Sequence, residues 1–254
     1  MARQAPVRDV APTVQRLRLR YAKRGRLRFT STRDFQRALE RALRRTGVPM
    51  AYSQGFNPHP RISYTNAAPT GTASEAEYVE LALVKRLDPE RLRDALDEAL
   101  PEGLDVLEVV EVRTPDLAAR LEASVWTVEL PGVGCEEASS AAAAFLGCDR
   151  AEVSRLTKSG MRTFDAREPV VRLETREASP GADGTPCAIL DLVVRHVTPS
   201  VRPDDVLAAL RLVADLVPPI PARVTRLAQG PLVDGASDGD PRRAVSDPLA
   251  ADRD

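Results

Sequence analysis

Hydrophobic and polar residues follow two clear periods in the first part of the chain. Between residues 16 and 21, leucines and a tyrosine alternate with arginines, and a period of two predicts a β-strand with one buried and one basic face. Between residues 31 and 47 the period changes, because Phe35, Leu39 and Leu43 recur every four residues. That spacing places them on one side of a helix, so a strand followed by an amphipathic helix is predicted.

The patterns that follow predict three further strands and one more helix. Residues 62–64 and 78–84 are apolar stretches on either side of a Pro/Gly turn and predict two strands. Residues 89–100 begin with a proline after Asp88 and carry leucines and alanines at helical spacing, which predicts a helix. Residues 104–112 supply a last strand. The order β-α-β-β-α-β is typical of the ferredoxin-like split βαβ fold.

The second half repeats this order more faintly. Strands are predicted at 125–130 and 188–194, helices at 136–146 and 203–216, two short strand-like runs within 153–173, and a closing strand at 223–227. We therefore predict an α+β protein built from tandem ferredoxin-like units.

Four segments are predicted along the chain. Residues 1–13 contain two prolines and no periodic pattern and are expected to be a flexible lead-in. Residues 14–116 and 117–230 are expected to be the first and second ferredoxin-like units, each close to the usual size of a domain. Residues 231–254 are rich in Asp, Pro, Gly and Ser and are predicted to be a disordered tail, because such a composition buries too little apolar area to offset ordering entropy.

Charge is distributed unevenly, although the net charge is only -1 at pH 7. Residues 16–45 hold twelve arginines and lysines against two acidic residues. A basic block on a near-neutral chain favours a polyanionic partner, and arginines also line the side of the first predicted helix opposite its apolar stripe. The predicted RNA-contacting residues are Arg16, Arg18 and Arg20 of the strand and Arg33, Arg37 and Arg41 of the helix.

Cysteine and histidine usage favours neither a disulfide framework nor a metal site. The three cysteines, Cys135, Cys148 and Cys187, are widely and irregularly spaced, so reduced thiols are expected. With only two histidines and no nucleotide-binding glycine loop, no metal and no cofactor are predicted. The chain has no apolar run of about 20 residues and no signal-peptide core, so a cytoplasmic protein is expected.

The most distinctive stretch is Tyr-Ser-Gln-Gly-Phe-Asn-Pro-His-Pro-Arg at residues 52–61. Each proline holds the residue before it out of the helical region, so Asn57, His59 and Arg61 are expected to project together from an extended run toward one ligand. Two aromatic rings in the same stretch offer stacking surfaces for a base. The predicted ligand-binding residues are Tyr52, Ser53, Gln54, Gly55, Phe56, Asn57, His59 and Arg61.

A plainer interpretation of this stretch competes with the first. The stretch would then be a rigid connector, with Tyr52 and Phe56 in the core and His59 bonded to a backbone carbonyl. Loops on rigid scaffolds carry function disproportionately often, so both interpretations of this stretch stay open.

Weaker candidates lie in the second half. A secondary polar cluster is predicted there, from Lys158, Arg162, Asp165 and Arg167. An aspartate near arginines stays ionised and is available as a base or nucleophile, but an ordinary surface ion-pair ladder is the arrangement that such residues favour. His196 follows an apolar strand and is expected to be structural.

The 52–61 stretch also carries a resemblance to a known family. This block, the pair Glu77-Tyr78, and Lys158-Ser-Gly160 leading to Asp165-Ala-Arg167 resemble the radical-SAM-associated protein family, whose activity is not established. The resemblance extends over about residues 16–230. Members are commonly encoded beside, or fused to, radical SAM proteins with a cobalamin-binding-like domain. The resemblance therefore implies a radical SAM protein encoded nearby as partner, and it implies no reaction. Because the cysteines of this chain are too far apart to hold an iron–sulfur cluster, the cluster would belong to that partner.

These observations favour a non-catalytic RNA-binding or adaptor module that works with a radical SAM partner. Ferredoxin-like sheets often bind RNA, and with aromatic residues at only 4%, phosphate contacts are expected to dominate. Two alternatives stay open. One is an RNA-modifying enzyme with Asp165 or His59 as acid or base. The other is a protein-binding subunit whose basic helix docks on an acidic face.

Overall fold

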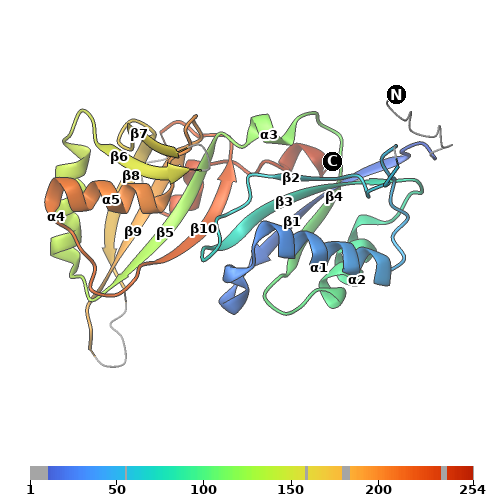
Figure 1. The fold of residues 1–254 in the computed structure, drawn as a ribbon, viewed down its shortest axis with the longest axis horizontal. Coiled ribbons are helices and arrows are strands. Elements are labelled where there is room, and N and C mark those ends of the chain that lie inside the picture. The colour runs from blue at the N-terminus through green and yellow to red at the C-terminus, as the bar shows by residue number, and fades with distance from the viewer. Residues whose placement is uncertain (1–10, 55, 158–159, 179–183, 236–238, 254) are drawn as a thin grey trace. The chain divides into compact units, whose positions relative to one another are not determined.

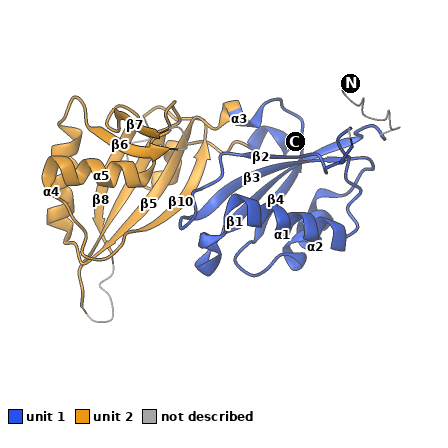
Figure 2. Cartoon of the chain, viewed as in Figure 1, with its two compact units in different colours: residues 1–118, 249–254 blue, residues 119–248 orange. Residues whose placement is uncertain are grey.

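A computed structural model describes residues 11–54, 56–157, 160–178, 184–235 and 239–253. The chain divides into two compact units (Figure 2). The first comprises residues 1–118 together with 249–254, and the second comprises residues 119–248. Of the predicted lead-in at 1–13, residues 1–10 lie outside the described residues.

The first unit has the predicted element order β-α-β-β-α-β (Figure 1). Its strands form an antiparallel sheet in the order β4-β1-β3-β2. A 3-10 helix, η1 (Gly25–Phe29), follows the first strand. The other elements are β1 (Gln15–Lys23), α1 (Thr32–Arg45), β2 (Ile62–Thr65), β3 (Ala73–Leu83), α2 (Pro89–Ala99) and β4 (Val106–Glu111).

Both helices of the first unit begin at side-chain caps. The Ser31 hydroxyl accepts a hydrogen bond from the Asp34 backbone N–H at 3.2 Å, which satisfies one of the free donors at the start of α1. At the start of α2, Asp88 accepts from the N–H groups of Glu90 at 2.9 Å and Arg91 at 3.2 Å. These caps fix where each helix starts and hence how it enters the core.

The two helices cover one face of this sheet because their apolar stripes match the apolar face of the strands. Phe35, Leu39 and Leu43 of α1 belong to the same buried cluster as Leu17 and Leu19 of β1, and leucines of α2 join it. Figure 1 shows α1 and α2 side by side on this face. Side chains alternate along a strand, so the arginines of β1 point to the opposite face.

The second unit has a four-stranded antiparallel sheet of order β10-β5-β9-β8 and a separate hairpin, β6-β7. The short helix α3 (Leu117–Arg120) lies where the sequence passes from one unit to the other. The remaining elements are β5 (Ala123–Pro131), α4 (Cys135–Leu146), β6 (Glu152–Thr157), β7 (Gly160–Asp165), β8 (Val170–Glu177), β9 (Cys187–Arg195), α5 (Pro203–Ala214) and β10 (Arg223–Gly230).

The two short strand-like runs expected within residues 153–173 are present as β6 and β7, which pair with each other. A third strand, β8, was not expected; it continues to Glu177 and pairs with β9. In β8 only Val170 and Leu173 are buried. These two residues are three positions apart, so the strand lacks the period of two by which a half-buried strand is predicted.

The expectation that residues 231–254 are disordered is wrong for the described part of this segment. It contains two short 3-10 helices, η2 (Pro241–Ala244) and η3 (Ala250–Asp252). Ala244 and Val245 pack on a buried cluster formed by strands β5 and β9, while Leu249 is fully buried. A few apolar residues spread through a polar segment thus anchor it on surfaces that the rest of the chain provides.

The described residues contain no helix that is both long and apolar enough to cross a membrane. The three cysteines are free thiols. Within the same described ranges, no three His, Cys, Asp or Glu side chains are grouped so that they could hold a metal ion.

Candidate functional site

The 52–61 stretch folds back on itself as a narrow antiparallel loop. The Ser53 N–H donates to the His59 carbonyl at 2.8 Å, and the His59 N–H donates to the Ser53 hydroxyl at 3.0 Å. Nearer the base, the Arg61 N–H donates to the Ala51 carbonyl at 2.8 Å. The base is tied to β3, because Ala82 donates to Arg61 and accepts from Ala51. Ser53 therefore has a structural role in closing the loop.

The outer part of the loop is exposed. Tyr52 is 43% exposed and Phe56 is 52% exposed, and Gln54 and Asn57 are also exposed. Gly55 lies outside the described residues. The connector interpretation, which places both rings in the core, is therefore wrong for Tyr52 and Phe56.

A hollow of about 210 Å³ lies between this loop and helix α1. His59 contributes an imidazole to this hollow and Tyr52 contributes a phenol. Glu40 and Arg44 of α1 contribute opposite charges and form an ion pair at 3.8 Å. Its lining residues are Glu40, Leu43, Arg44, Val48, Met50, Tyr52, Pro58, His59 and Pro60. We call it the loop hollow.

Asn57, His59 and Arg61 were predicted to project together toward one ligand, but the structure does not place all three side chains in one hollow. His59 lines the loop hollow, whereas Asn57 and Arg61 are not among its lining residues. Asn57 lies in the bend at the end of the loop, where the period of two of an extended run no longer holds. The Arg61 guanidinium instead approaches the Thr13 hydroxyl at 3.4 Å.

The arginines predicted on α1 do form an exposed row. Arg33, Arg37, Arg41 and Arg44 are exposed, and we call them the basic helix face. Arg37 lies 3.7 Å from Asp34 in an exposed i,i+3 ion pair, which contributes little free energy. Among the described residues, no ion pair involves Arg33 or Arg41. The row reaches the loop hollow through Arg44.

The arginines of β1 are engaged with carboxylates. The sheet register places Arg18 opposite Glu80 and Arg20 opposite Glu108, and the ion-pair distances are 3.2 and 3.4 Å. Arg16 also lies 3.5 Å from Glu80. Arg18 is only 1% exposed, so the prediction that it contacts RNA from an open basic face is wrong. The sequence signal for this pairing is the presence of glutamates, among them Glu80 and Glu108, within the otherwise largely apolar strands β3 and β4.

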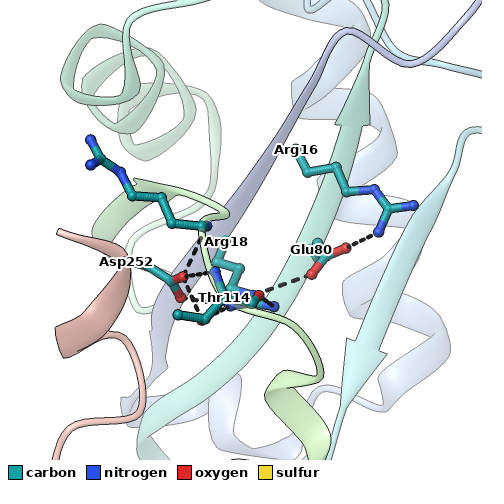
Figure 3. Close-up of polar contacts among 6 residues, drawn as sticks. Arg16, Arg18, Glu80, Thr114 and Asp252 are labelled. Carbon is teal, nitrogen blue, oxygen red and sulfur yellow. Dashed lines mark hydrogen bonds and ion pairs between the residues drawn. The ribbon is translucent and has the colours of Figure 1, made fainter. Parts of the chain in front are cut away.

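Arg18 also pairs with a further carboxylate, which the sequence did not predict. Asp252, in the segment predicted to be disordered, accepts hydrogen bonds from Arg18 and from Thr114, which follows β4 (Figure 3). Burial alone would raise the pKa of Asp252, but the hydrogen bonds from Thr114 and Arg18 and from two backbone N–H groups outweigh it and hold that pKa well below its usual range. No local sequence pattern marks this pairing.

The secondary polar cluster is not assembled in the second unit. Asp165 accepts hydrogen bonds from the backbone N–H groups of Ala151 and Arg167, both at 2.9 Å. The Arg167 guanidinium donates to backbone carbonyls at 3.1 and 3.3 Å. Arg162 lies on the β6-β7 hairpin opposite another arginine, and Lys158 lies outside the described residues. Asp165 and Arg167 thus hold turns in place.

His196 has the arrangement of a structural histidine, as expected. Its Nε2 lies 2.6 Å from the Ser124 hydroxyl and its Nδ1 lies 2.6 Å from the Leu121 carbonyl. Burial lowers the pKa of His196, and the charge of Arg226 lowers it further, against the opposing effect of the Leu121 bond. Ser124 is 1% exposed, so this serine–histidine pair is closed to a substrate.

The sequence profile of a family described as "Uncharacterized protein conserved in bacteria (DUF2344)" matches residues 16–203. The chain belongs to this family. The match runs from β1 to the start of α5, and so includes the loop hollow, the basic helix face and the β6-β7 hairpin. None of the curated proteins compared with the chain matches it.

Some solved structures share a low similarity with the chain. An unknown protein from Galdieria sulphuraria is 16% identical, over 84% of this chain and 96% of that chain, with a TM-score of 0.24. Ferric DtpA from Streptomyces lividans is 11% identical, over 87% and 88%, with a TM-score of 0.23. A DyP-type peroxidase from Streptomyces coelicolor is 11% identical, over 89% and 91%, also at 0.23. Scores this low carry no argument about this chain.

Proposed function

We propose that the protein is a non-catalytic RNA-binding module of the cytoplasm that works with a radical SAM partner. The observation that carries this proposal is the basic helix face, an exposed row of four arginines that ends at the loop hollow. The resemblance to the radical-SAM-associated family supplies the partner. RNA is the polyanion that the combination of a phosphate-binding row and a nearby aromatic loop suits best.

The row has the length and charge needed to follow an RNA backbone. Arg33 and Arg44 are separated by about 16 Å along the helix, at about 1.5 Å per residue. Arginine guanidinium groups bind phosphate oxygens with paired hydrogen bonds. The row therefore contacts several successive phosphates, and binding to such a row is expected to weaken steeply as salt rises.

The loop hollow would receive one unpaired base. Tyr52 lines it and Phe56 presents a second exposed ring on the same loop, and aromatic stacking binds a base without demanding a particular sequence. His59 and Glu40 line the hollow and offer hydrogen-bonding groups to the edge of that base. Phosphate contacts supply most of the affinity, and the hollow orients the RNA.

A second candidate function is an RNA-modifying enzyme with His59 as acid or base. The position of His59 in the loop hollow, with Glu40 and Tyr52, favours it. Asp165 is a poorer candidate because its carboxylate accepts two backbone N–H groups. His59→Ala separates the two functions, because an enzyme would lose turnover while keeping most of its RNA affinity.

We also propose that each unit is ferredoxin-like. The strand orders β4-β1-β3-β2 and β10-β5-β9-β8 support this, since each follows the split βαβ plan when the β6-β7 hairpin is treated as an insertion.

The test reverses charge on the basic helix face. The triple variant Arg33→Glu, Arg37→Glu, Arg41→Glu should abolish retention of RNA on the full chain while leaving the fold intact, because these positions lie opposite the buried residues of α1. A matched control reverses Arg150, Arg211 and Arg223, which are exposed in the second unit, and changes the total charge equally. Filter binding across a salt series measures both.

Two results would count against this proposal. Equal RNA loss in the control would mean that overall charge, and not the helix face, determines binding. Retention of RNA by the folded α1 variant would remove the face from the binding site. Purification of the tagged full chain from native cells tests the partner, and absence of a radical SAM protein from the eluate, together with unchanged RNA binding, would favour a module that acts alone.

A further inference from the structure

Arg18 has the largest fully buried side chain in the described part of the chain. Arginine is seldom enclosed unless it is paired. Its guanidinium donates from Nε to Glu80 at 3.2 Å, from Nη1 to the Thr114 hydroxyl at 3.0 Å, and from Nη2 to the Thr114 carbonyl at 2.8 Å. Since Leu17 and Leu19 point into the core, Arg18 lies on the sheet face that α1 and α2 leave uncovered.

The carboxylate of Asp252 is surrounded by hydrogen-bond donors (Figure 3). Its Oδ2 accepts from Arg18 Nη1 at 2.6 Å. Its Oδ1 accepts from the backbone N–H of Arg113 at 3.0 Å, the N–H of Thr114 at 2.9 Å and the Thr114 hydroxyl at 2.6 Å. One guanidinium, one hydroxyl and two consecutive backbone N–H groups thus converge on one small anion. Such a donor set is typical of sites that bind phosphate.

These donors stay in place without Asp252. Glu80 and the Thr114 carbonyl hold the Arg18 guanidinium from its other side, and the two backbone N–H groups belong to the chain that follows β4. Arg16 adds a second guanidinium 3.5 Å from Glu80, so two guanidinium groups share this one glutamate. A hollow of about 280 Å³, lined in part by Arg16, Arg18 and Thr114, opens beside the site.

The segment that delivers Asp252 has little secondary structure of its own. Its 3-10 helix, η3, is three residues long, and a helix this short has no stability of its own. The buried Leu249 anchors one end. Arg253, 40% exposed, pairs with Glu108 at 2.5 and 2.9 Å at the other end. A ligand with more negative charge than one carboxylate can therefore compete with Asp252 for the same donors.

We propose that Arg18, Thr114 and the backbone N–H groups of residues 113 and 114 form a phosphate-binding site that the Asp252 carboxylate occupies as an internal competitor. A phosphate group enters when residues 249–253 detach, and the adjacent hollow holds the rest of the ligand. The phosphate belongs either to a small molecule or to an RNA backbone. The site lies on the sheet face opposite the basic helix face, so it does not depend on the proposed function.

The test measures binding of inorganic phosphate by calorimetry at constant ionic strength. Full-length Asp252→Ala should bind phosphate about tenfold more tightly than the parent chain, because the competitor for the charged donors is gone. Arg253→Ala should also tighten binding, since it loosens the segment without touching the donors. Adding Thr114→Val to Asp252→Ala should reverse the gain. Asp94→Ala is the control, because it removes an exposed carboxylate that is not a partner of any of these donors.

Melting curves and an RNA arm complete the experiment. Phosphate should raise the melting temperature of Asp252→Ala more than that of the parent chain. A short RNA without a terminal phosphate, bound more tightly by the same variant, would identify the RNA backbone as the source, and binding of inorganic phosphate alone would identify a small molecule. Either result supports the site.

Three results would overturn the proposal. The first is a folded Asp252→Ala variant that binds phosphate no better than the parent chain or the Asp94→Ala control. The second is a gain that survives Thr114→Val, which would place the bound phosphate elsewhere. Should Asp252→Ala fail to fold, Arg253→Ala decides, because its ion pair lies at the surface, and an unchanged phosphate affinity in that variant would mean that Asp252 is a structural anchor only.

Discussion

Asp252 keeps a charged carboxylate where its side chain is fully enclosed. Burial favours the protonated form, but the donors from Thr114, Arg18 and the backbone outweigh burial and leave the folded-state pKa below its ordinary value. In the unfolded chain the pKa of an aspartate is about 3.9. As pH falls, the unfolded state takes up its proton first. The stabilisation is therefore fully present above about pH 5 and is lost as acid is added below it.

We predict that Asp252→Asn removes this part of the pH dependence. At pH 7 the variant should be less stable by about 1.5–3 kcal/mol, because the hydrogen bonds lose the charge of their acceptor. Between pH 5 and pH 3 its free energy of unfolding should fall less than that of the parent chain. Urea unfolding at pH 7, 5 and 3 measures both. Parallel pH profiles for the two proteins would contradict the depressed pKa.

Arg18 illustrates what residue patterns leave undetermined. The alternation of arginine with leucine in β1 predicts a strand and identifies which residues face the core. It does not reveal that Glu80 and Glu108 lie opposite Arg18 and Arg20, because strand register is determined by pairing between distant segments. A face that looks basic along the sequence is neutralised in the folded protein.

At the scale of elements, strong periodicity predicts the parts that bury a complete face. Helix α1 is predicted because Phe35, Leu39 and Leu43 share one side, and all three are buried. Strand β8 escapes prediction because it buries too few residues to show a period. The prolines of the 52–61 loop indicate that its backbone is restricted to non-helical conformations. Its folded-back shape, however, depends on the hydrogen bonds between Ser53 and His59, which the presence of prolines does not predict.

The loop yields the next prediction, which compares stability with function. Phe56→Ala and His59→Ala should each change stability by less than about 1 kcal/mol, because both side chains are exposed. The Pro58→Ala, Pro60→Ala double variant should lose about 1 kcal/mol per site through the larger unfolded ensemble. All three should weaken RNA retention, since the loop loses an exposed ring, or the loop hollow loses an imidazole or its fixed backbone. Denaturant melts and filter binding measure the two properties on the same samples.

Leu39→Ala provides the matched comparison for that series. Leu39 is 1% exposed, so its truncation should destabilise by about 2–5 kcal/mol while leaving the affinity of the remaining folded protein for RNA unchanged. A Phe56→Ala variant as unstable as Leu39→Ala would restore the connector interpretation. Unchanged RNA retention in all three loop variants would remove the loop from the binding site.

At the scale of the whole molecule, composition predicts order poorly where a segment docks on structure made elsewhere. Residues 231–254 have too few apolar residues to form a core of their own. They need none, because Ala244 and Val245 join a cluster in the second unit and Leu249 and Asp252 are buried in the first. Composition indicates only what a segment can bury by itself. The residues on which this segment packs belong to β1, β5 and β9.

We therefore predict that truncation after Gly230 is strongly destabilising. Loss of Asp252 removes a buried partner of Arg18, which costs on the order of 3–5 kcal/mol, and the contacts of Leu249, Ala244 and Val245 are lost as well. Because about 1 kcal/mol shifts the melting temperature of a chain this long by about 2–4 °C, the drop should be on the order of 10 °C or more. Differential scanning calorimetry measures this drop.

Val233→Ala, at a side chain 42% exposed, is the control and should change the melting temperature by only about 1–2 °C. A truncated chain that melts with the full-length protein would show that the docked segment contributes no stability, and it would remove the competition on which the phosphate-binding site depends.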